Sequence, residues 1–378
     1  MMTNPSRLMK HLSVLLSGAI LSVLSVLPAA AQAERILDGL SLPDGFSISV
    51  FAQASGARSM AMCGEVLYVG TRDDTVYAVR DDDRNGAADS VTVVGSGLRV
   101  PNGLDCRDGK LLIALQNRVI AAPINADGTL AAPLRSAETI FTGLPNYRGH
   151  GWRYARFGPD GRFHIGVGAP CNICETKDYE GTLIAIDADG GNPQILASGV
   201  RNTVGFDWNP VTGNLFFTDN GADRMGDLIP PDELNEIEQP GGFFGFPYRG
   251  GKDIALTGYE GRTPPQPAIP TVIDFDAHSA NLGFRFIRGT GFPAEYRGDA
   301  IVAQHGSWNR SDPIGYRLVR VRFDEAGKAV DHEVFIDGWL RPGGGVTGRP
   351  VDVLELADGS LLVSDDYAGL IYRIAYAK

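Results

Sequence analysis

The chain has 378 residues, a formal charge of −11, 48 glycines and four cysteines. Glycine is well above its usual share of about 7%, which is typical of a turn-rich β protein and excludes a mainly helical one. The negative charge argues against nucleic acid and anionic lipid as partners, since both would repel an acidic surface.

Residues 1–33 predict a secretory signal peptide. Two basic residues precede an apolar run from Leu12 to Leu27, and the small-residue triplet 31–33 supplies a cleavage site. The run is shorter than the roughly 20 residues that span a membrane, which argues against the alternative of an uncleaved anchor. Cleavage changes the charge from −11 to −13 because it removes two basic and no acidic residues. Residues 34–378 contain no polar linker and are expected to form one periplasmic or secreted domain without a membrane span.

One pattern of strands and turns recurs six times along the mature chain. Each copy has a short apolar segment, a turn rich in Gly, Asp or Asn, a β-rich strand, and a third strand a few residues later. Such a hairpin plus one strand cannot bury both its faces alone, but it can when the copies stack around an axis. The sequence therefore predicts an all-β fold, a six-bladed β-propeller. The six copies begin at Met60, Asn102, Tyr154, Val204, Leu282 and Val351.

The repeat also predicts two contacts between segments that are distant in the sequence. Residues 48–51, Ile-Ser-Val-Phe, have the composition of a strand and would close the ring by joining the last blade. Cys63 and Cys106 occupy equivalent positions of the first two copies. Because equivalent points on adjacent blades can be near neighbours, a Cys63–Cys106 disulfide is expected.

The other two cysteines form a C-x-x-C motif. Cys171 and Cys174 are followed by Glu175, where covalent attachment of a c-type haem needs histidine. An even number of cysteines in an exported chain favours disulfides. A tight Cys171–Cys174 disulfide in a loop is therefore predicted, with a redox or metal-binding role as the alternative.

Polar side chains precede several copies at positions where a simple turn does not need them. Because the copies are equivalent, these leading loops should converge on the same mouth of the central channel. A guanidinium cluster in an acidic protein indicates a pocket for a multiply anionic ligand, and a histidine beside it can act as a general base. Taken singly, each residue can equally be a solvated arginine or a hydrogen-bonded structural histidine. The residues are His150, Arg201, Asn202, His278 and Arg349, in segments 146–152, 199–202, 277–281 and 348–350, and Arg58 before the first copy.

Two further segments are unusual in composition. The turn Asn220-Gly-Ala-Asp-Arg leads to carboxylates at Asp232 and Glu233 and to a Gly-rich, aromatic stretch over residues 241–248. Carbonyls of a Gly-rich turn among carboxylates suit Ca²⁺, although a solvated acidic loop is the alternative. The second segment, residues 304–310, is too polar and too aromatic for an ordinary strand end.

Together these motifs resemble the soluble quinoprotein glucose/sorbosone dehydrogenase family, and the resemblance covers essentially the whole mature chain. It rests on the order and spacing of His150, Arg201-Asn202, Asn220-Gly221, Asp-Glu-Leu-Asn-Glu-Ile at 232–237 and Gly-Gly-Phe-Phe-Gly-Phe-Pro at 241–247. Three segments look closer to the L-sorbosone dehydrogenase-like branch than to the glucose dehydrogenases, namely residues 170–175, 277–280 and 305–310.

The resemblance implies an enzyme dependent on pyrroloquinoline quinone (PQQ). In that family the histidine matching His150 takes a proton from the sugar hydroxyl as hydride passes to the quinone. The pair matching Arg201 and Asn202 contacts the quinone side of the cofactor, so His150 and Arg201 are the expected catalytic residues. The arginine matching Arg349 helps to hold the carboxylates of PQQ, and Arg58 and His278 are expected to join it in binding the cofactor.

The resemblance also implies a calcium ion bound to the cofactor. The family uses main-chain oxygens of a Gly-Pro pair, for which this chain has Gly221-Ala222. Carbonyl ligation tolerates that departure. A lysine that contacts the cofactor in the glucose enzymes has no obvious counterpart, and His305 or Arg310 occupies that stretch.

The charge of the expected site agrees with the resemblance. PQQ is a tricarboxylate that the arginines can bind, and Ca²⁺ would polarise its quinone as a Lewis acid. The expected activity is oxidation of a sugar or a sugar-derived aldehyde. Because no haem-attachment motif is present, the electrons are expected to leave to a separate cytochrome or quinone.

Other functions agree less well with the sequence. A G-x-G-x-x-G pattern at residues 343–348 has neither the preceding strand nor the following helix of a nicotinamide site, which excludes that cofactor. A lactonase-type hydrolytic propeller remains an alternative, although it would need convergent carboxylates more than arginines. A non-catalytic propeller that binds a sugar or a protein is the other alternative.

Overall fold

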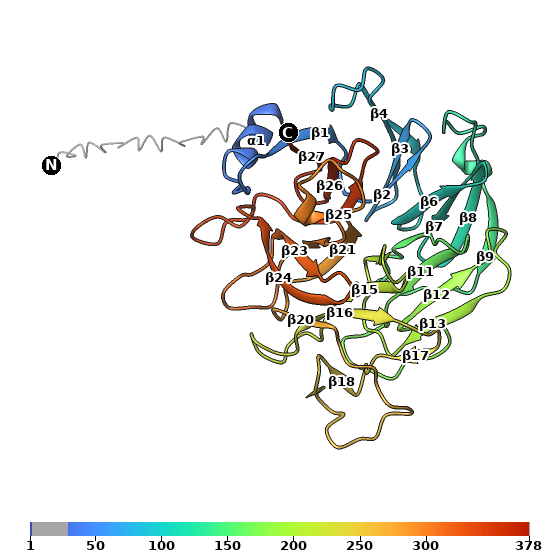
Figure 1. Ribbon diagram of the computed structural model, residues 1–378, viewed down its shortest axis with the longest axis vertical. Helices are drawn as coiled ribbons and strands as arrows, with labels where there is room; N and C mark the ends of the chain where they lie inside the picture. Colours follow the sequence, from blue (N-terminus) through green and yellow to red (C-terminus); the bar gives the residue numbers. More distant parts are fainter. Residues whose placement is uncertain (2–28, 378) are drawn as a thin grey trace.

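Residues 29–377, together with Met1, are described by the computed structural model (Figure 1). Apart from Met1 and residues 29–33, the predicted signal peptide lies outside the described residues. A helix, α1 (Ala29–Leu37), crosses the expected cleavage point and was not predicted. No helix in residues 29–377 is long and apolar enough to cross a membrane.

The six predicted repeats form six sheets around one axis, which confirms the β-propeller. Blade 1 contains β2 (Ala57–Cys63), β3 (Val66–Thr71), β4 (Val76–Arg80) and β5 (Ser90–Gly95). Blade 2 contains β6 (Gly103–Arg107), β7 (Lys110–Ala114), β8 (Arg118–Pro123) and β9 (Glu138–Thr142), with the short helix η1 (Leu134–Ser136) before β9. Blade 3 contains β10 (Ala155–Phe157), β11 (Phe163–Val167), β12 (Thr182–Ile186) and β13 (Gln194–Ser198), and β17 (Gly242–Phe243) extends it in parallel with β13.

The second half of the ring follows the same plan. Blade 4 contains β14 (Phe206–Trp208), β15 (Leu215–Asp219), β16 (Asp232–Ile237) and β20 (Ile273–Phe275), and the hairpin of β18 (Arg249–Gly250) and β19 (Ile254–Ala255) lies within its long β16–β20 connection. Blade 5 contains β21 (Asn281–Phe286), β22 (Ala300–Gln304), β23 (Arg317–Phe323) and β24 (Ala329–Ile336), with η2 (Ala294–Tyr296) before β22. Blade 6 contains β25 (Pro350–Glu355), β26 (Leu361–Asp365), β27 (Leu370–Tyr376) and β1 (Phe46–Gln53).

The N-terminal strand closes the ring as predicted. β1 is antiparallel to β27, with Ile48 opposite Ile374, and the two strands lie side by side in Figure 1. Phe46 at the start of β1 makes edge-to-face contacts with Phe292 and Phe335 of blade 5. Strand β1 therefore closes the ring by hydrogen bonds to β27, and its Phe46 packs blade 6 against blade 5.

Each blade has at least four strands, although the repeat predicted only three. The additional outer strand has few buried side chains: β5, for example, has no buried residue and exposes Val91 and Val93. A strand with two solvated faces needs no apolar alternation, so the sequence gives little signal for it. The core lies instead between neighbouring blades, as where Leu112 of β7 packs in one cluster with Ile165 and Ile184 of blade 3.

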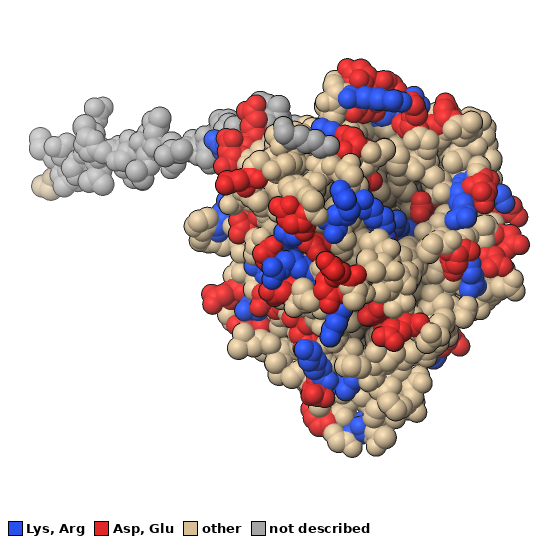
Figure 2. All heavy atoms as spheres, in the orientation of Figure 1, with Lys and Arg blue, Asp and Glu red and all other residues tan. Residues whose placement is uncertain are grey.

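Both predicted disulfides are present. Cys63–Cys106 joins β2 to β6, with Cα atoms 5.9 Å apart, and so links blades 1 and 2. Cys171–Cys174 closes a tight loop after β11. Basic and acidic side chains are interspersed over the face drawn in Figure 2.

Candidate active site

The leading loops converge on one cavity of about 310 Å³ at the mouth of the central channel. Most of the residues predicted from the sequence line it: Arg58, His150, Arg201, Asn202, Gly221, His278, His305 and Arg349. Arg58 does so from inside strand β2, and not from a loop before it. Ala222 and Arg310 do not line the cavity.

His150 is held in one orientation by its own backbone and by its ring. Its φ of 48° is a left-handed conformation that non-glycine residues rarely adopt and that is concentrated at functional sites. Gly168 lies so close that a Cβ atom there would be 2.4 Å from the Cβ of His150. The Nδ1 atom is 2.8 Å from the main-chain oxygen of Ala169. Because a carbonyl can only accept, Nδ1 carries the proton and Nε2 keeps its lone pair.

The charge state of His150 suits a base. Burial, and then the positive charge of Arg201, lower the pKa of His150 to about 4. The imidazole is therefore neutral near pH 7, with Nε2 unprotonated. A neutral imidazole beside a polar cavity can accept a proton from a bound hydroxyl group.

Arg201 is buried, and its guanidinium group is held by three neighbours. It pairs with Asp223 at 2.8 Å and donates to the main-chain oxygen of Asn220 at 3.1 Å. It also donates to both the main-chain oxygen and Oδ1 of Asn172, at 3.0 and 2.8 Å. Asn172 lies between the two cysteines of the Cys171–Cys174 disulfide. The C-x-x-C loop therefore positions Arg201, which gives this motif a role that the sequence did not indicate.

Buried aspartates at the ends of second strands hold two of the leading loops. Asp219, the last residue of β15, accepts the backbone N–H groups of Arg201 and Asn202 at 2.8 and 2.5 Å. Asp365, the last residue of β26, accepts the backbone N–H of Arg349 at 3.0 Å. Burial raises the pKa of each of these aspartates to about 6. Sequence reasoning missed both, although Thr-Asp-Asn at 218–220 and Ser-Asp-Asp at 364–366 occupy the same phase of the repeat.

Asp366 gathers three basic side chains on one side of the cavity. Its carboxylate lies 2.8 Å from both Arg58 and His305, and 3.5 Å from Arg72. Burial alone would raise the pKa of Asp366, but His305 and the arginines lower it well below its ordinary value. For His305 burial is the larger effect, and its pKa falls to about 4 despite Asp366. His305 is therefore a neutral hydrogen-bonding group near pH 7.

Of the two candidates on blade 5, His305 lines the cavity and Arg310 does not. The guanidinium group of Arg310 turns away to donate to the main-chain oxygen of Ala277 at 3.0 Å. Arg349 donates to the main-chain oxygens of His305 and Gly306, at 2.9 and 2.7 Å, which fixes its side chain beside the cavity.

His278 has a φ of 65°, and its Nε2 donates to the main-chain oxygen of Gly226 at 2.8 Å. Because the carbonyl can only accept, Nε2 carries a proton. This histidine is therefore held at the wall of the cavity by one hydrogen bond, on the side of the β15–β16 connection.

The cavity is less cationic than the sequence predicted. Arg58 and Arg201 each pair with a carboxylate, Asp366 and Asp223 respectively, that sequence reasoning did not include. Arg349 is bound by carbonyl oxygens and has no carboxylate within ion-pair distance among the described residues. The guanidinium groups converge as expected, but paired charges hold most of them in place.

The predicted calcium segment is built differently from a solvated acidic loop. Asp232 and Glu233 begin strand β16 and are buried. Asp232 accepts the backbone N–H groups of Gly221 and Ala280, at 2.8 and 2.6 Å, so it fixes the turn that contains the expected ligands. Gly221 lines the cavity, while the methyl group of Ala222 packs in a small apolar cluster behind it.

Unpartnered oxygens test whether the cavity suits PQQ and Ca²⁺. The side-chain oxygens of Asn202, Asn220 and Asn309 are buried and have no hydrogen-bond partner among the described residues. All three asparagines line the cavity. Buried acceptors normally have a donor or a cation as partner, and amide oxygens are good ligands for Ca²⁺. A cavity of about 310 Å³ is also at the lower end of the size range for small-molecule sites. These residues fit a bound group of that kind.

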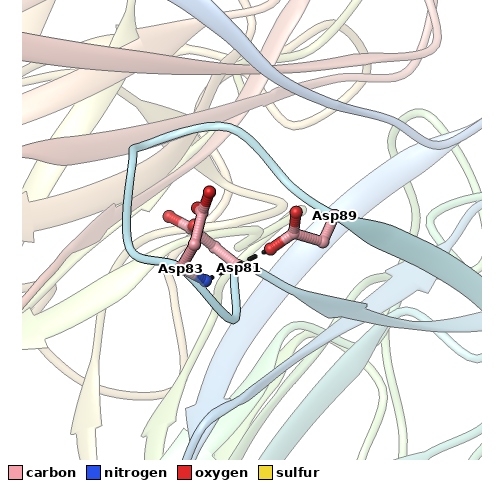
Figure 3. A group of neighbouring side chains, drawn as sticks. All are labelled: Asp81, Asp83 and Asp89. Atoms are coloured by element: carbon pink, nitrogen blue, oxygen red, sulfur yellow. Dashed lines mark hydrogen bonds between the residues drawn. The ribbon is translucent and has the colours of Figure 1, made fainter.

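A separate group of carboxylates lies on the turn between β4 and β5. Asp81, Asp83 and Asp89 each place one oxygen within 4.8 Å of the others (Figure 3). Asp81 accepts the backbone N–H of Gly86, and Asp89 that of Asp82, at 2.9 and 2.7 Å. These hydrogen bonds close an exposed turn, and none of the three residues lines the cavity.

The fold is shared with solved propellers that are described as PQQ or AA12 proteins. The PQQ domain of pyranose dehydrogenase from Coprinopsis cinerea, in its holo form, superposes with a TM-score of 0.74 at 20% identity, covering 89% of this chain and 97% of that domain. A calcium structure of the AA12 carbohydrate-active enzyme of Trichoderma reesei gives 0.76 at 18% identity over 90% and 97%. PQQ-bound aldose sugar dehydrogenase of Streptomyces coelicolor gives 0.61 at 19% identity over 89% and 100%. The chain is therefore structurally similar to the soluble PQQ sugar dehydrogenase and AA12 propellers.

Sequence comparison adds a family relative. A TrAA12-like family model matches residues 261–376, which include blade 5 and strands β25 to β27 of blade 6. A protein of Borreliella burgdorferi, described only as uncharacterized, is 31% identical over 360 residues, covering 92% of this chain and 93% of the relative. The chain belongs to the same family as this Borreliella burgdorferi protein.

Proposed function

We propose that the protein is a PQQ- and Ca²⁺-dependent dehydrogenase of a sugar or sugar-derived aldehyde. The observation that carries the proposal is the pairing of a neutral, oriented His150 with Arg201 and Arg349 in one cavity. The similarity of the fold to propellers named as PQQ sugar dehydrogenases supports the same activity. The motifs at residues 170–175, 277–280 and 305–310 favour a substrate of the sorbosone type.

Each group at the cavity has a task in this proposal. When bound, PQQ supplies a two-electron acceptor, and Ca²⁺ supplies a Lewis acid next to it. Arg349, whose guanidinium carbon lies 5.4 Å from the ring centroid of Tyr316, would bind a carboxylate of PQQ. Arg201 and Asn202 would contact the quinone side. The main-chain oxygens of Gly221 and Ala222 would hold Ca²⁺, because Asp232 already fixes their turn.

His150 would receive the proton from the substrate. Nε2 is the one nitrogen of the ring with a free lone pair, since Nδ1 donates to Ala169. As the substrate hydroxyl loses its proton to Nε2, its oxygen becomes electron-rich and the adjacent C–H bond weakens. The bond between Nδ1 and Ala169 would also stabilise the imidazolium that forms.

A hydrolytic, lactonase-type function has less support. The buried aspartates beside the cavity are engaged by protein donors: Asp219 holds two backbone N–H groups and Asp366 binds three basic side chains. Carboxylates with these partners are not available as a convergent set of metal ligands.

Reconstitution of the purified chain tests the proposal. PQQ and Ca²⁺ are added to the metal-free protein, and cofactor binding and reduction of an artificial dye are followed with a panel of aldoses and sugar aldehydes. We expect tight PQQ binding that is lost in Arg201→Ala and Arg349→Ala and retained in Arg297→Ala, a control at an exposed arginine of blade 5. Absence of binding, or binding unaffected by the first two changes, would rule out the quinoprotein function.

A further inference from the structure

A second hollow of about 570 Å³ adjoins the cavity on the side of blades 1 and 2. The two share the lining residues Arg72 and Trp152, so they lie side by side. The charged and aromatic side chains that line this second hollow, here called the arginine groove, are Arg72, Asp73, Asp74, Arg99, Arg148 and Trp152. It is larger than the cavity, and nothing in the roles proposed for PQQ and Ca²⁺ uses it.

The arginine groove has guanidinium groups that the protein does not neutralise. Arg99 and Arg148 are exposed and have no ion pair among residues 29–377, and the exposed Arg72 lies 3.5 Å from Asp366. Of the two carboxylates that line the groove, Asp74 is engaged by the backbone N–H of Gly97 and the hydroxyl of Thr75. Asp73 and Asp74 stay negatively charged, so the groove is distinguished not by a net basic charge but by Arg99 and Arg148, which have no ion-pair partner in the described part of a chain of net charge −11.

Buried and aromatic groups prepare the groove for a ligand. The Nε atom of Arg99 donates to Oε1 of Gln116 at 2.5 Å, and Gln116 is buried and donates in turn to the main-chain oxygen of Tyr147. This orients Arg99 and leaves its two terminal nitrogens free of protein partners in the described structure. Trp152 forms the wall between the groove and the cavity, with the guanidinium carbon of Arg58 5.4 Å from its ring centroid. An indole wall can pack against the C–H face of a sugar ring.

We infer that the arginine groove binds the carboxylate of an acidic sugar whose oxidisable carbon lies beside His150. This inference rests on the proposed function, and it names the substrate class as sugar acids such as hexuronates. Arg99 and Arg148 would hold the carboxylate, because guanidinium groups match its two oxygens. Trp152 would carry the ring, and His150 lies two positions from Arg148 in the same leading loop.

Binding and turnover together test the inference. Affinities of D-galacturonate and of D-galactose are measured by calorimetry on the PQQ- and Ca²⁺-loaded protein and on the unloaded protein, alongside dye reduction. We expect galacturonate to bind at least tenfold more tightly than galactose, and its affinity to fall with added NaCl while that of galactose does not. The double variant Arg99→Ala/Arg148→Ala should lose the preference, Arg99→Lys/Arg148→Lys should keep part of it, and Arg297→Ala should keep all of it.

The outcomes separate this inference from the proposed function. Equal binding of the two sugars, or a preference that survives the double alanine variant in a folded protein, would overturn the groove assignment even if dye reduction occurs. If acetate competes at the same concentration as galacturonate, the groove recognises a carboxylate alone, and the claim that it binds a sugar ring would be overturned. Selective galacturonate binding without any dye reduction would instead support sugar-acid binding in the arginine groove and contradict the proposed dehydrogenase function.

Discussion

The Nδ1 atom of His150 lies 2.8 Å from the main-chain oxygen of Ala169, the residue that follows Gly168. This single hydrogen bond decides which nitrogen of the imidazole is protonated. It leaves Nε2 as the acceptor, and the positive φ of His150 keeps the ring beside the cavity. The residue is thus prepared to accept a proton before any substrate binds.

Replacing His150 by alanine should therefore reduce the rate without removing the cofactor. We expect kcat for dye reduction to fall by roughly 10²–10⁴-fold, the usual contribution of a general base. PQQ affinity should change little, because the proposed cofactor contacts come from Arg201, Asn202 and Arg349. Rapid-mixing kinetics together with a PQQ titration measure both quantities. Full activity of His150→Ala would show that another group is the base.

The rate should stay high in mildly acidic solution. His150 accepts a proton only when neutral, and its pKa is lowered from 6.5 to about 4. Activity should therefore be present above that pKa and be lost as the pH falls through about 4. First-turnover rates of the PQQ- and Ca²⁺-loaded enzyme between pH 3.5 and 8 measure this loss of activity, and circular dichroism at each pH separates it from acid unfolding. A midpoint near 6.5 would contradict the assignment.

The two disulfides should differ in what they stabilise. Cys63–Cys106 spans 43 positions, so replacing both cysteines by alanine should lower the free energy of unfolding by roughly 2–4 kcal/mol and leave PQQ affinity unchanged. Cys171–Cys174 spans only 3 positions, so its loss should affect global stability less.

Replacement of Cys171 and Cys174 should instead weaken PQQ binding several-fold, because Asn172 between them holds Arg201. Denaturant unfolding and PQQ titration of both double variants make the comparison. The reverse pattern, with cofactor loss only for the Cys63 and Cys106 variant, would refute this role of the C-x-x-C loop.

Asp219→Asn should loosen the loop that contains Arg201 and Asn202. The buried carboxylate accepts two backbone N–H groups, and an amide side chain offers only one oxygen. We expect a loss of about 1–3 kcal/mol in the free energy of unfolding and weaker PQQ binding. Asp324→Asn, at an exposed turn of blade 5, is the matched control. Unchanged stability and binding in Asp219→Asn would show that the loop is held by other contacts.

Several features of the fold follow from patterns within single copies of the repeat. The apolar segments and Gly-rich turns predicted six blades, and the strand at residues 48–51 predicted the closure by β1. Equivalent phase predicted the Cys63–Cys106 bond. These inferences succeeded because side-chain alternation and turn residues are local properties that a sequence displays directly. The outer strands were missed because solvated side chains carry no such alternation, as in β5.

The convergence of His150, Arg201 and Arg349 on one cavity was likewise predictable from their position before each copy. The partners of these residues were not. Asp366 neutralises Arg58 across 308 positions of sequence, and Asn172 reaches Arg201 from another blade. The sequence by itself thus determined which side chains face the mouth, since that depends on the phase of the repeat. Only the closed ring decided which of their charges remain free, because it brings distant carboxylates and carbonyls within hydrogen-bond distance, and in the part of the chain described here it leaves Arg99 and Arg148 unpaired.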